Sequence, residues 1–300
     1  SAGVALVAGG GAVGFLGLTS LTNAPPQFGG FVPFQGGAIS PPLYPRPNIA
    51  VSADNTDALV RGPLDLMALT ITLVSTGYQF NITGYDGSLG YGSAVLRGHG
   101  AIAFDPSNAG RAILGQSPTA NNIILITGLP KTITQTSTLL LSSTPRSIAI
   151  TPNGSYAIVG ADAGFYVVGG VDAGALMLQT PFAPSATSGS ANSPAYVACD
   201  GSMRNLQNIT SVAVTSNGKY IVLLGSAPGL SCLNGYNDTV VVLPFNQSNG
   251  STPTPAPTPA PTTPPQGGAT PAPTPTPVPT MFTQNNIVTQ PANTDYMVVR

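Results

Sequence analysis

Three glycines near the N-terminus have the spacing of a phosphate-binding loop. Gly9, Gly11 and Gly14 form the pattern G-x-G-x-x-G after the apolar run VALVA. In dinucleotide-binding folds such a loop joins a strand to a helix, and an acidic residue about 20 positions later binds the ribose. The first acidic residue of this chain is Asp54, so that partner is missing. We therefore expect a strand, a glycine-rich turn and a second strand here, and no bound cofactor.

Carboxylates are the next candidates for chemistry, because acid–base catalysis needs titratable groups held close together. The chain has ten acidic residues, all of them Asp. Four lie in or beside predicted turns, where Asp is favoured for its local hydrogen bonds: Asp54, Asp57, Asp105 and Asp295. Asp86 and Asp162 could form a glycosidase-like pair, but nothing in their spacing supports it. His99, the only histidine, precedes a predicted strand and is expected to be structural, so we expect no catalytic or metal-binding residue.

The two cysteines, Cys199 and Cys232, both stand beside loops rich in Gly, Ser and Asn. In an extracellular chain they would close one disulfide across an insertion, and we predict that bond. The alternative is a pair of unrelated buried thiols.

The chain carries little charge. Charged residues make up 6% of its 300 residues, against about 25% in a typical soluble domain, and the net charge is −1. Binding of nucleic acid through a basic surface is thereby excluded. So little charge protects poorly against association, and we expect covalent sugar to keep the protein in solution. Residues 1–18 carry no charge, but a Pro-rich segment rather than a basic one follows, so we expect no membrane insertion.

Four segments repeat one pattern: a short alternating strand, a polar turn with Asn or Asp, and a second apolar strand. They are NIAVSADNTDALVRG (48–62), AIAFDPSNAGRAILG (101–115), SIAITPNGSYAIVG (147–160) and SVAVTSNGKYIVLLG (211–225). Further apolar strands follow each segment, which makes a unit of about 45 residues, the length of a four-stranded propeller blade. Asn153-Gly154 and Asn217-Gly218 suit tight turns with a positive φ. The alternating Ile, Val and Ala of each first strand are expected to line the core between blades.

This pattern, clearest at residues 148–159 and 212–222, resembles the extracellular β-propeller repeats called YVTN-type or surface-layer-type repeats. The four repeats and the two end pieces together predict an all-β propeller with about five four-stranded blades. We expect a partial blade at 1–20, a Pro-rich connector at 21–47, four blades at 48–250, a Pro/Thr-rich track at 251–280 and a second partial blade at 281–300.

The two ends of the chain both look like parts of a blade. Residues 4–18 match the second half of a blade, and NIVTQPANTDYMVVR (286–300) echoes the segment that begins at Asn48. The ends could meet and complete a fifth blade, which would remove exposed edges. Alternatively, the chain is cut from a longer one, or each end completes a blade in a neighbouring subunit.

Between residues 251 and 280 proline alternates with Thr or Ala, which predicts an extended polyproline II rod. The track resembles the Thr-Pro and Ala-Pro tracts of hydroxyproline-rich glycoproteins of plants and green algae, which implies hydroxylation and O-glycosylation. The candidate prolines are Pro253, Pro255, Pro257, Pro259, Pro261, Pro264, Pro265, Pro271, Pro273, Pro275, Pro277 and Pro279. The alternative is a bare spacer between domains.

Six N-glycosylation sequons also occur, close to the number that chance would produce in a chain this rich in Asn, Ser and Thr. They begin at Asn81, Asn153, Asn208, Asn237, Asn246 and Asn249. The last three lead into the proline track and form the most persuasive group.

These observations favour a secreted, non-enzymatic structural glycoprotein that builds a filament, surface coat or cell wall. Its partners would be copies of itself or neighbouring repeat units, and covalent glycans. The resemblance to algal glycoproteins suggests a flagellar-hair (mastigoneme) component. The alternative is a propeller on a stalk that binds glycan or protein, with Tyr78, Tyr85 and Tyr91 gathered at the channel mouth.

Overall fold

The protein is described from a computed structural model. The structure describes residues 3–9, 12–18, 27–33, 48–61, 66–74, 77–89, 101–115, 121–179, 191–197, 202–226, 238–245 and 286–288. Within these ranges every regular element is a β-strand, which confirms the all-β class. The same ranges contain no helix with the length and apolar character needed to cross a membrane.

Four sheets of four antiparallel strands form most of the described chain, and we call them blades 1 to 4. Blade 1 consists of β4 (Asn48–Val51), β5 (Asp57–Arg61), β6 (Leu66–Val74) and β7 (Gly77–Asp86). Blade 2 consists of β8 (Ile102–Asp105), β9 (Asn108–Gly115), β10 (Asn122–Thr127) and β11 (Thr134–Leu140). Blade 3 consists of β12 (Pro145–Ile150), β13 (Tyr156–Ala161), β14 (Gly164–Gly169) and β15 (Met177–Leu178). Blade 4 consists of β18 (Gln207–Val214), β19 (Tyr220–Ser226), β20 (Asp238–Pro244) and β21 (Asn286–Val288). In each blade the strands pair in chain order.

A three-stranded sheet precedes blade 1, formed by β1 (Gly3–Gly9), β2 (Ala12–Leu18) and β3 (Gln27–Pro33). The glycine fingerprint lies in its first hairpin, where Gly9 pairs with Ala12. This confirms the expected strand, turn and strand, and no helix begins at the loop. The third strand falls inside residues 21–47, which we expected to be a connector.

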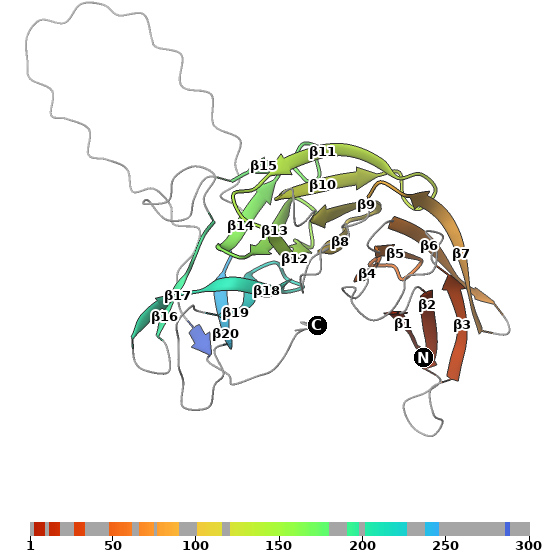
Figure 1. The fold of residues 1–300 in the computed structure, drawn as a ribbon, viewed down its shortest axis with the longest axis horizontal. Helices are drawn as coiled ribbons and strands as arrows, with labels where there is room; N and C mark the ends of the chain where they lie inside the picture. The colour runs from red at the N-terminus through yellow and green to blue at the C-terminus, as the bar shows by residue number, and fades with distance from the viewer. Residues whose placement is uncertain are drawn as a thin grey trace, which may run out of the picture.

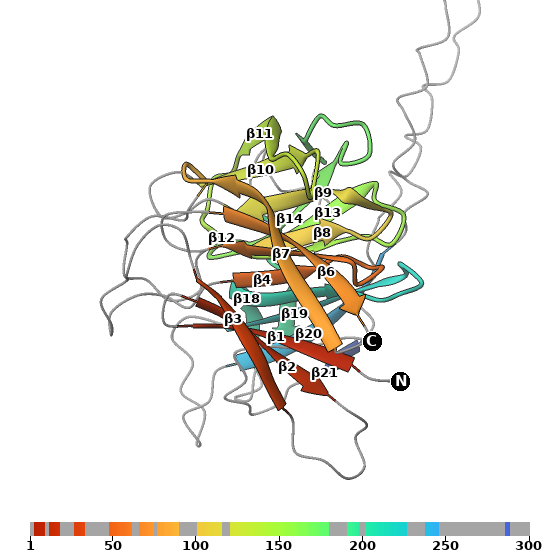
Figure 2. The ribbon, with the colours of Figure 1, turned by 90° about the vertical axis from the view of Figure 1, so that its right-hand side faces the viewer.

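The sheets follow one another along an arc, with strands β4, β8, β12 and β18 toward its inner side (Figure 1). The inner strand β4 contacts β8, β8 contacts β12, and β12 contacts β18, and β1 contacts β4. The view turned by 90° shows the N-terminal sheet beside blade 1 (Figure 2). A two-stranded hairpin, β16 (Ala195–Val197) and β17 (Met203–Asn205), is inserted between blades 3 and 4.

Apolar side chains fill the space between successive blades, so these interfaces are removed from water. Leu59 of blade 1 packs in one cluster with Leu114 of blade 2, and Ile113 of blade 2 packs with Val159 of blade 3. Ile158 of blade 3 packs with Leu223 of blade 4. The described core is therefore a series of layers between sheets, each made by two neighbouring repeats.

The four repeats share one register. The aligned alanines of the inner strands pair with the second strand at equivalent places: Ala50 with Leu59, Ala103 with Ile113, Ala149 with Ile158, and Ala213 with Val222. In blades 1 to 3 this alanine packs against the core that leads to the next blade. The prediction that the first strands line the core between blades is confirmed there.

Arg61 breaks the apolar pattern at one register position. It pairs with Asn48, whereas the equivalent position of blade 3 is Gly160, which pairs with Ser147. The Arg61 side chain is fully buried and donates hydrogen bonds to the carbonyl oxygens of Leu89 and Gly115. Because Gly115 belongs to blade 2, Arg61 connects the two blades.

The strand that follows the proline track belongs to blade 4. In β21, Asn286 pairs with Val242 and Val288 with Val240, so this strand completes the sheet begun by β18. We expected residues 281–300 to form a partial blade, because their sequence echoes the segment that begins at Asn48, and the structure describes residues 286–288 of this range. A similar sequence does not determine which strand edge a segment pairs with, and here β21 pairs with the edge of β20. None of the described strands from the C-terminal part enters the N-terminal sheet.

Candidate functional site: the polar turns of the blades

The first hairpin of blades 1, 3 and 4 ends in the same hydrogen-bonded turn. Its first residue donates a backbone hydrogen bond to the carbonyl of its last residue: Ser52 to Asp57 (2.9 Å), Thr151 to Tyr156 (2.8 Å) and Thr215 to Tyr220 (3.0 Å). The hydroxyl of the first residue accepts the backbone N–H of the last, at 2.9, 3.1 and 3.1 Å respectively. The same hydroxyl donates to the side chain two residues on: Asp54 (2.6 Å), Asn153 (2.7 Å) and Asn217 (2.7 Å). One short motif, Ser/Thr-x-Asp/Asn, thus closes three turns.

Each of these turns needs one residue with a left-handed backbone. Asn55 has a φ of 61°, Gly154 of 72° and Gly218 of 67°. Asn and Gly are the residues that adopt this conformation at least cost. The two Asn-Gly pairs were predicted for this reason, and the prediction is confirmed at both.

Blade 2 replaces the hydroxyl turn with an ion pair. Asp105 stands where blade 3 has Thr151, and Arg111 stands where blade 3 has Tyr156. Arg111 Nη2 lies 2.6 Å from Asp105 Oδ2, and Nε donates to the same oxygen at 2.7 Å. The other carboxylate oxygen of Asp105 accepts the N–H and the hydroxyl of Ser107, at 2.8 and 2.7 Å. The Asp105 side chain is fully buried and Arg111 is 12% exposed, so the pair is largely removed from water.

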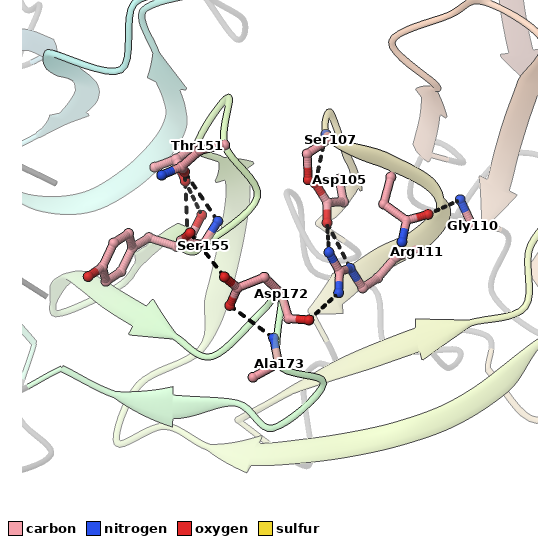
Figure 3. A network of polar contacts seen from close by, with 11 residues as sticks. Asp105, Ser107, Gly110, Arg111, Thr151, Ser155, Asp172 and Ala173 are labelled. Carbon is pink, nitrogen blue, oxygen red and sulfur yellow. Dashed lines mark hydrogen bonds and ion pairs between the residues drawn. The ribbon is translucent and has the colours of Figure 1, made fainter. Parts of the chain in front are cut away.

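The ion pair continues into blade 3 (Figure 3). Arg111 Nη1 donates to the backbone carbonyl of Asp172 at 2.7 Å, in the turn between β14 and β15. The Asp172 carboxylate accepts a hydrogen bond from the Ser155 hydroxyl at 3.2 Å and one from the N–H of Ala173 at 2.9 Å. One polar network therefore joins the first turn of blade 2 to two turns of blade 3.

Gly154 touches this network through its backbone. A Cβ built on Gly154 would collide with the Ser107 hydroxyl and would lie 2.6 Å from Asp105 Oδ1. Only a residue without a side chain lets the two turns approach this closely. Gly154 therefore serves two needs at once, the positive φ of its own turn and the contact with blade 2.

The two carboxyls of the blade 1 turn are shifted in opposite directions. Hydrogen bonds from the Ser52 hydroxyl and from Thr56 lower the pKa of Asp54. Burial raises the pKa of Asp57, although hydrogen bonds from Thr70 and Thr56 oppose that shift. Asp54 is held within its own turn, whereas Asp57 also accepts a hydrogen bond from Thr70 on β6.

Asp86 and Asp162, the candidate catalytic pair, belong to different blades and have separate partners. Asp86 ends β7, the outer strand of blade 1, and accepts the N–H and hydroxyl of Ser88 at 2.7 and 2.6 Å. Asp162 lies in the turn between β13 and β14 of blade 3 and forms an ion pair with Arg146. The geometry does not present them as an acid–base pair. Among the described residues no group of three or more His, Cys, Asp or Glu could hold a metal ion.

Three predicted glycosylation residues can be placed in the structure. Asn81 is exposed on β7, Asn153 is exposed in the blade 3 turn, and Asn208 is half-buried on β18 with a φ of 46°. The other predicted modification residues lie outside the described residues: Asn237, Asn246 and Asn249, the twelve prolines of the 251–280 track, and the predicted disulfide between Cys199 and Cys232. His99 also lies outside them.

Only one of the three tyrosines proposed for glycan binding has a described side chain. Tyr85 is 45% exposed and lies on the outer strand of blade 1, on the side of the sheet away from the inner strands. The side chain of Tyr78 and the whole of Tyr91 lie outside the described residues. The exposed tyrosine is therefore at the periphery and not at the inner strands.

Sequence reasoning missed the contacts that join blades. Arg61, Arg111 and Asp172 were not singled out, and Asp105 was interpreted as an ordinary turn residue. A signal was present, because Asp105 and Arg111 depart from the repeat at the first and last positions of one turn. Opposite charges that replace two neutral residues at the two ends of a turn are what an ion pair produces.

The arrangement of the sheets defines a β-propeller class of protein, with consecutive four-stranded blades. No known protein-family profile matches the sequence, and no curated protein matches it. Among solved structures, a protein of unknown function from Desulfotomaculum acetoxidans is similar with a TM-score of 0.55 and 14% identity, over 83% of this chain and 64% of that one. Hydrazine synthase of Kuenenia stuttgartiensis (TM-score 0.47, 15% identity, 80% and 58% covered) and the Cps50 (Swd1) β-propeller domain of Myceliophteria thermophila (0.46, 10%, 81% and 61%) also match. The chain spans less than two thirds of each of these structures, and at such identities the likeness concerns the fold alone.

Proposed function

We propose that this chain is a non-enzymatic structural glycoprotein, the building block of an extracellular filament, surface coat or cell wall. In this proposal the propeller is the rigid body and the proline track is a glycosylated rod. The resemblance of the track to hydroxyproline-rich glycoproteins makes a flagellar hair the most specific form of the proposal. The partners are further copies of the same unit.

The observation that carries the proposal is the set of hydrogen bonds and ion pairs that the described carboxylates form. Each accepts hydrogen bonds from neighbouring groups or pairs with an arginine: Asp54, Asp57, Asp86, Asp105, Asp162 and Asp172. Acid–base catalysis by carboxylates requires that they converge on a substrate. Here they hold turns, strands and neighbouring blades in place, which supports a structural role.

The scarcity of charge supports the same proposal. With 6% charged residues, the surface offers little repulsion between molecules. Such a surface favours association unless another hydrophilic group covers it, and glycan is such a group. A polymer subunit combines both features, contact faces and glycosylated regions.

The test is to produce the full chain in a secreting eukaryotic culture and to examine it in two ways. Glycopeptide mass spectrometry of residues 251–280 is expected to find hydroxyproline and attached sugar. Electron microscopy of the secreted material is expected to show strings or sheets of particles. An unmodified track on a protein that stays monomeric at high concentration contradicts the proposal.

A variant with the track prolines changed to serine is the matched control. It keeps the propeller sequence intact but removes the polyproline rod and its hydroxylation sites. We expect this variant to fold and to lose the assembled form.

A further inference from the structure

Two of the three described sequons, those at Asn81 and Asn208, differ in what surrounds them. Asn81 lies on β7, the outer strand of blade 1, where it pairs with Thr70. Its side chain is exposed. No described strand pairs with the other edge of β7. A glycan attached to the amide nitrogen of Asn81 would extend over this edge without displacing a described neighbour.

The rest of the Asn81 sequon is held in the fold by its own strand. A β-bulge interrupts the pairing of β7 with β6 at Thr83, because Ile82 pairs with Leu69 and Gly84 with Ala68. The Thr83 hydroxyl donates to the carbonyl oxygen of Ala68 at 3.3 Å. Thr83 therefore points to its own sheet while Asn81 faces outward.

Asn208 is in the opposite situation, at the contact between blades 3 and 4. Its backbone N–H donates to the carbonyl of Asp162 in blade 3 at 2.8 Å, and its amide nitrogen donates to the Ser226 hydroxyl at 3.5 Å. The next residue, Ile209, is fully buried in the core between these blades. A Cβ built on Gly160 of blade 3 would lie 2.6 Å from Ile209, so there is no spare room beside the sequon.

We propose that Asn81 carries an N-linked glycan and that Asn208 in the folded protein does not. The inference deepens the proposed function, on which it rests, by naming a modification site and a bare site on the propeller body. The physical reason is that a glycan is bulky and hydrophilic, and of these two amides only that of Asn81 has open surface in front of it. At Asn81 the glycan would also lie beside a strand edge with which no described strand pairs, which is a place where other chains could add.

The experiment uses the full chain secreted from eukaryotic cells. The folded, secreted protein is treated with peptide N-glycosidase in heavy-oxygen water, which converts each glycosylated Asn to labelled Asp. Peptide mass spectrometry then reports occupancy at every site. We expect label at Asn81 and none at Asn208.

Two pairs of variants separate glycosylation from stability. Thr83→Ala removes the sequon while keeping Asn81, and Thr83→Ser keeps the sequon. We expect Thr83→Ala to lose one glycan relative to Thr83→Ser on a denaturing gel, with both secreted. Asn81→Gln is expected to lose one glycan, and Asn208→Gln none.

The results that would overturn the inference differ from those that would also overturn the proposed function. Label at Asn208, or an unlabelled Asn81 beside labelled sites elsewhere, overturns the inference and leaves the glycoprotein proposal standing. The absence of sugar from every site, including the proline track, overturns both.

Discussion

The first turns of blades 2 and 3 occupy the same place in the repeat but are closed by different chemistry. Blade 3 uses the neutral hydroxyl of Thr151, whose partners lie within its own turn. Blade 2 uses the buried Asp105–Arg111 pair, and Arg111 continues to Asp172 in the next blade. The neutral turn stabilises one hairpin, whereas the charged turn also fixes the position of one blade against another.

The comparison shows how a repeat protein adds a connection by lengthening one turn by a residue and changing two side chains, since seven residues separate the paired Phe104 and Ala112 but six separate Ile150 and Ala157. A planar guanidinium carries several donors and can serve a carboxylate and a carbonyl at once. A threonine hydroxyl has one donor and is used up inside the turn. Arg111 therefore donates a hydrogen bond to a second blade and Thr151 does not, because the arginine side chain carries more hydrogen-bond donors.

The largest effect is expected where the two turns touch. Gly154→Ala places a Cβ against Ser107 and Asp105 and also strains a φ of +72°, so we expect a loss of about 3 kcal/mol in the free energy of unfolding. Gly174→Ala is the control, because Gly174 has a φ of +77° but nothing within 4 Å of its Cβ position. It should lose only about 1 kcal/mol, from backbone strain alone. Equal losses in urea denaturation would show that contact between the turns is unimportant.

Loss of the ion pair of blade 2 should cause the second largest loss in the free energy of unfolding. Arg111→Met leaves the fully buried Asp105 carboxylate without its cation, and we expect a loss of about 2–3 kcal/mol. The double variant Asp105→Thr with Arg111→Tyr removes both charges, so no buried carboxylate is left without a cation, and it should lose less stability than Arg111→Met alone. Chemical denaturation of both variants tests this. A double variant as unstable as the single one would mean that the unpaired Asp105 carboxylate is not the cause of the loss.

Substitutions in the neutral turns should cost less stability, and the cost should be larger in the more buried turn. Thr151→Val removes a buried hydroxyl that serves as donor and acceptor, and about 1–2 kcal/mol should be lost. Thr215→Val removes the same bonds in an exposed turn, where water can replace them, and about 0.5 kcal/mol should be lost. The two unfolding curves, measured side by side, give the comparison. The opposite order would contradict the assignment of the stronger turn to blade 3.

The smallest effect is a pH dependence in the turn of blade 1. Burial raises the pKa of Asp57 above its ordinary 3.8, so its contribution to stability is fully present below that value and is lost as pH rises through the folded-state pKa. Hydrogen bonds from Ser52 and Thr56 lower the pKa of Asp54, so its contribution is present above 3.8 and is lost as pH falls. Denaturation between about pH 3 and pH 6 should therefore show slopes changed in opposite directions by Asp57→Asn and Asp54→Asn. A change of the same sign in both variants would overturn this explanation.

Several features could be predicted from particular residues. The four repeats predicted the all-β class, the four-stranded blades and the positive φ at Gly154 and Gly218, and the structure confirms these. The missing acidic partner favoured a strand, a turn and a strand at Gly9, and Gly9 lies in a hairpin. The partner of β21 was not predictable, because its sequence resembles a first strand while its position in blade 4 is the last.

The sequence by itself determined what is local: strand alternation, turn residues and the repeat that places an alanine at one register position in every blade. Only the tertiary structure decided which turns meet, that Arg61 reaches Gly115, and that Arg111 joins Asp105 to Asp172. The physical reason is the distance along the chain over which each kind of interaction acts. Backbone propensity and period act between residues a few positions apart, whereas contacts between blades depend on how whole sheets stack, which no short segment encodes alone.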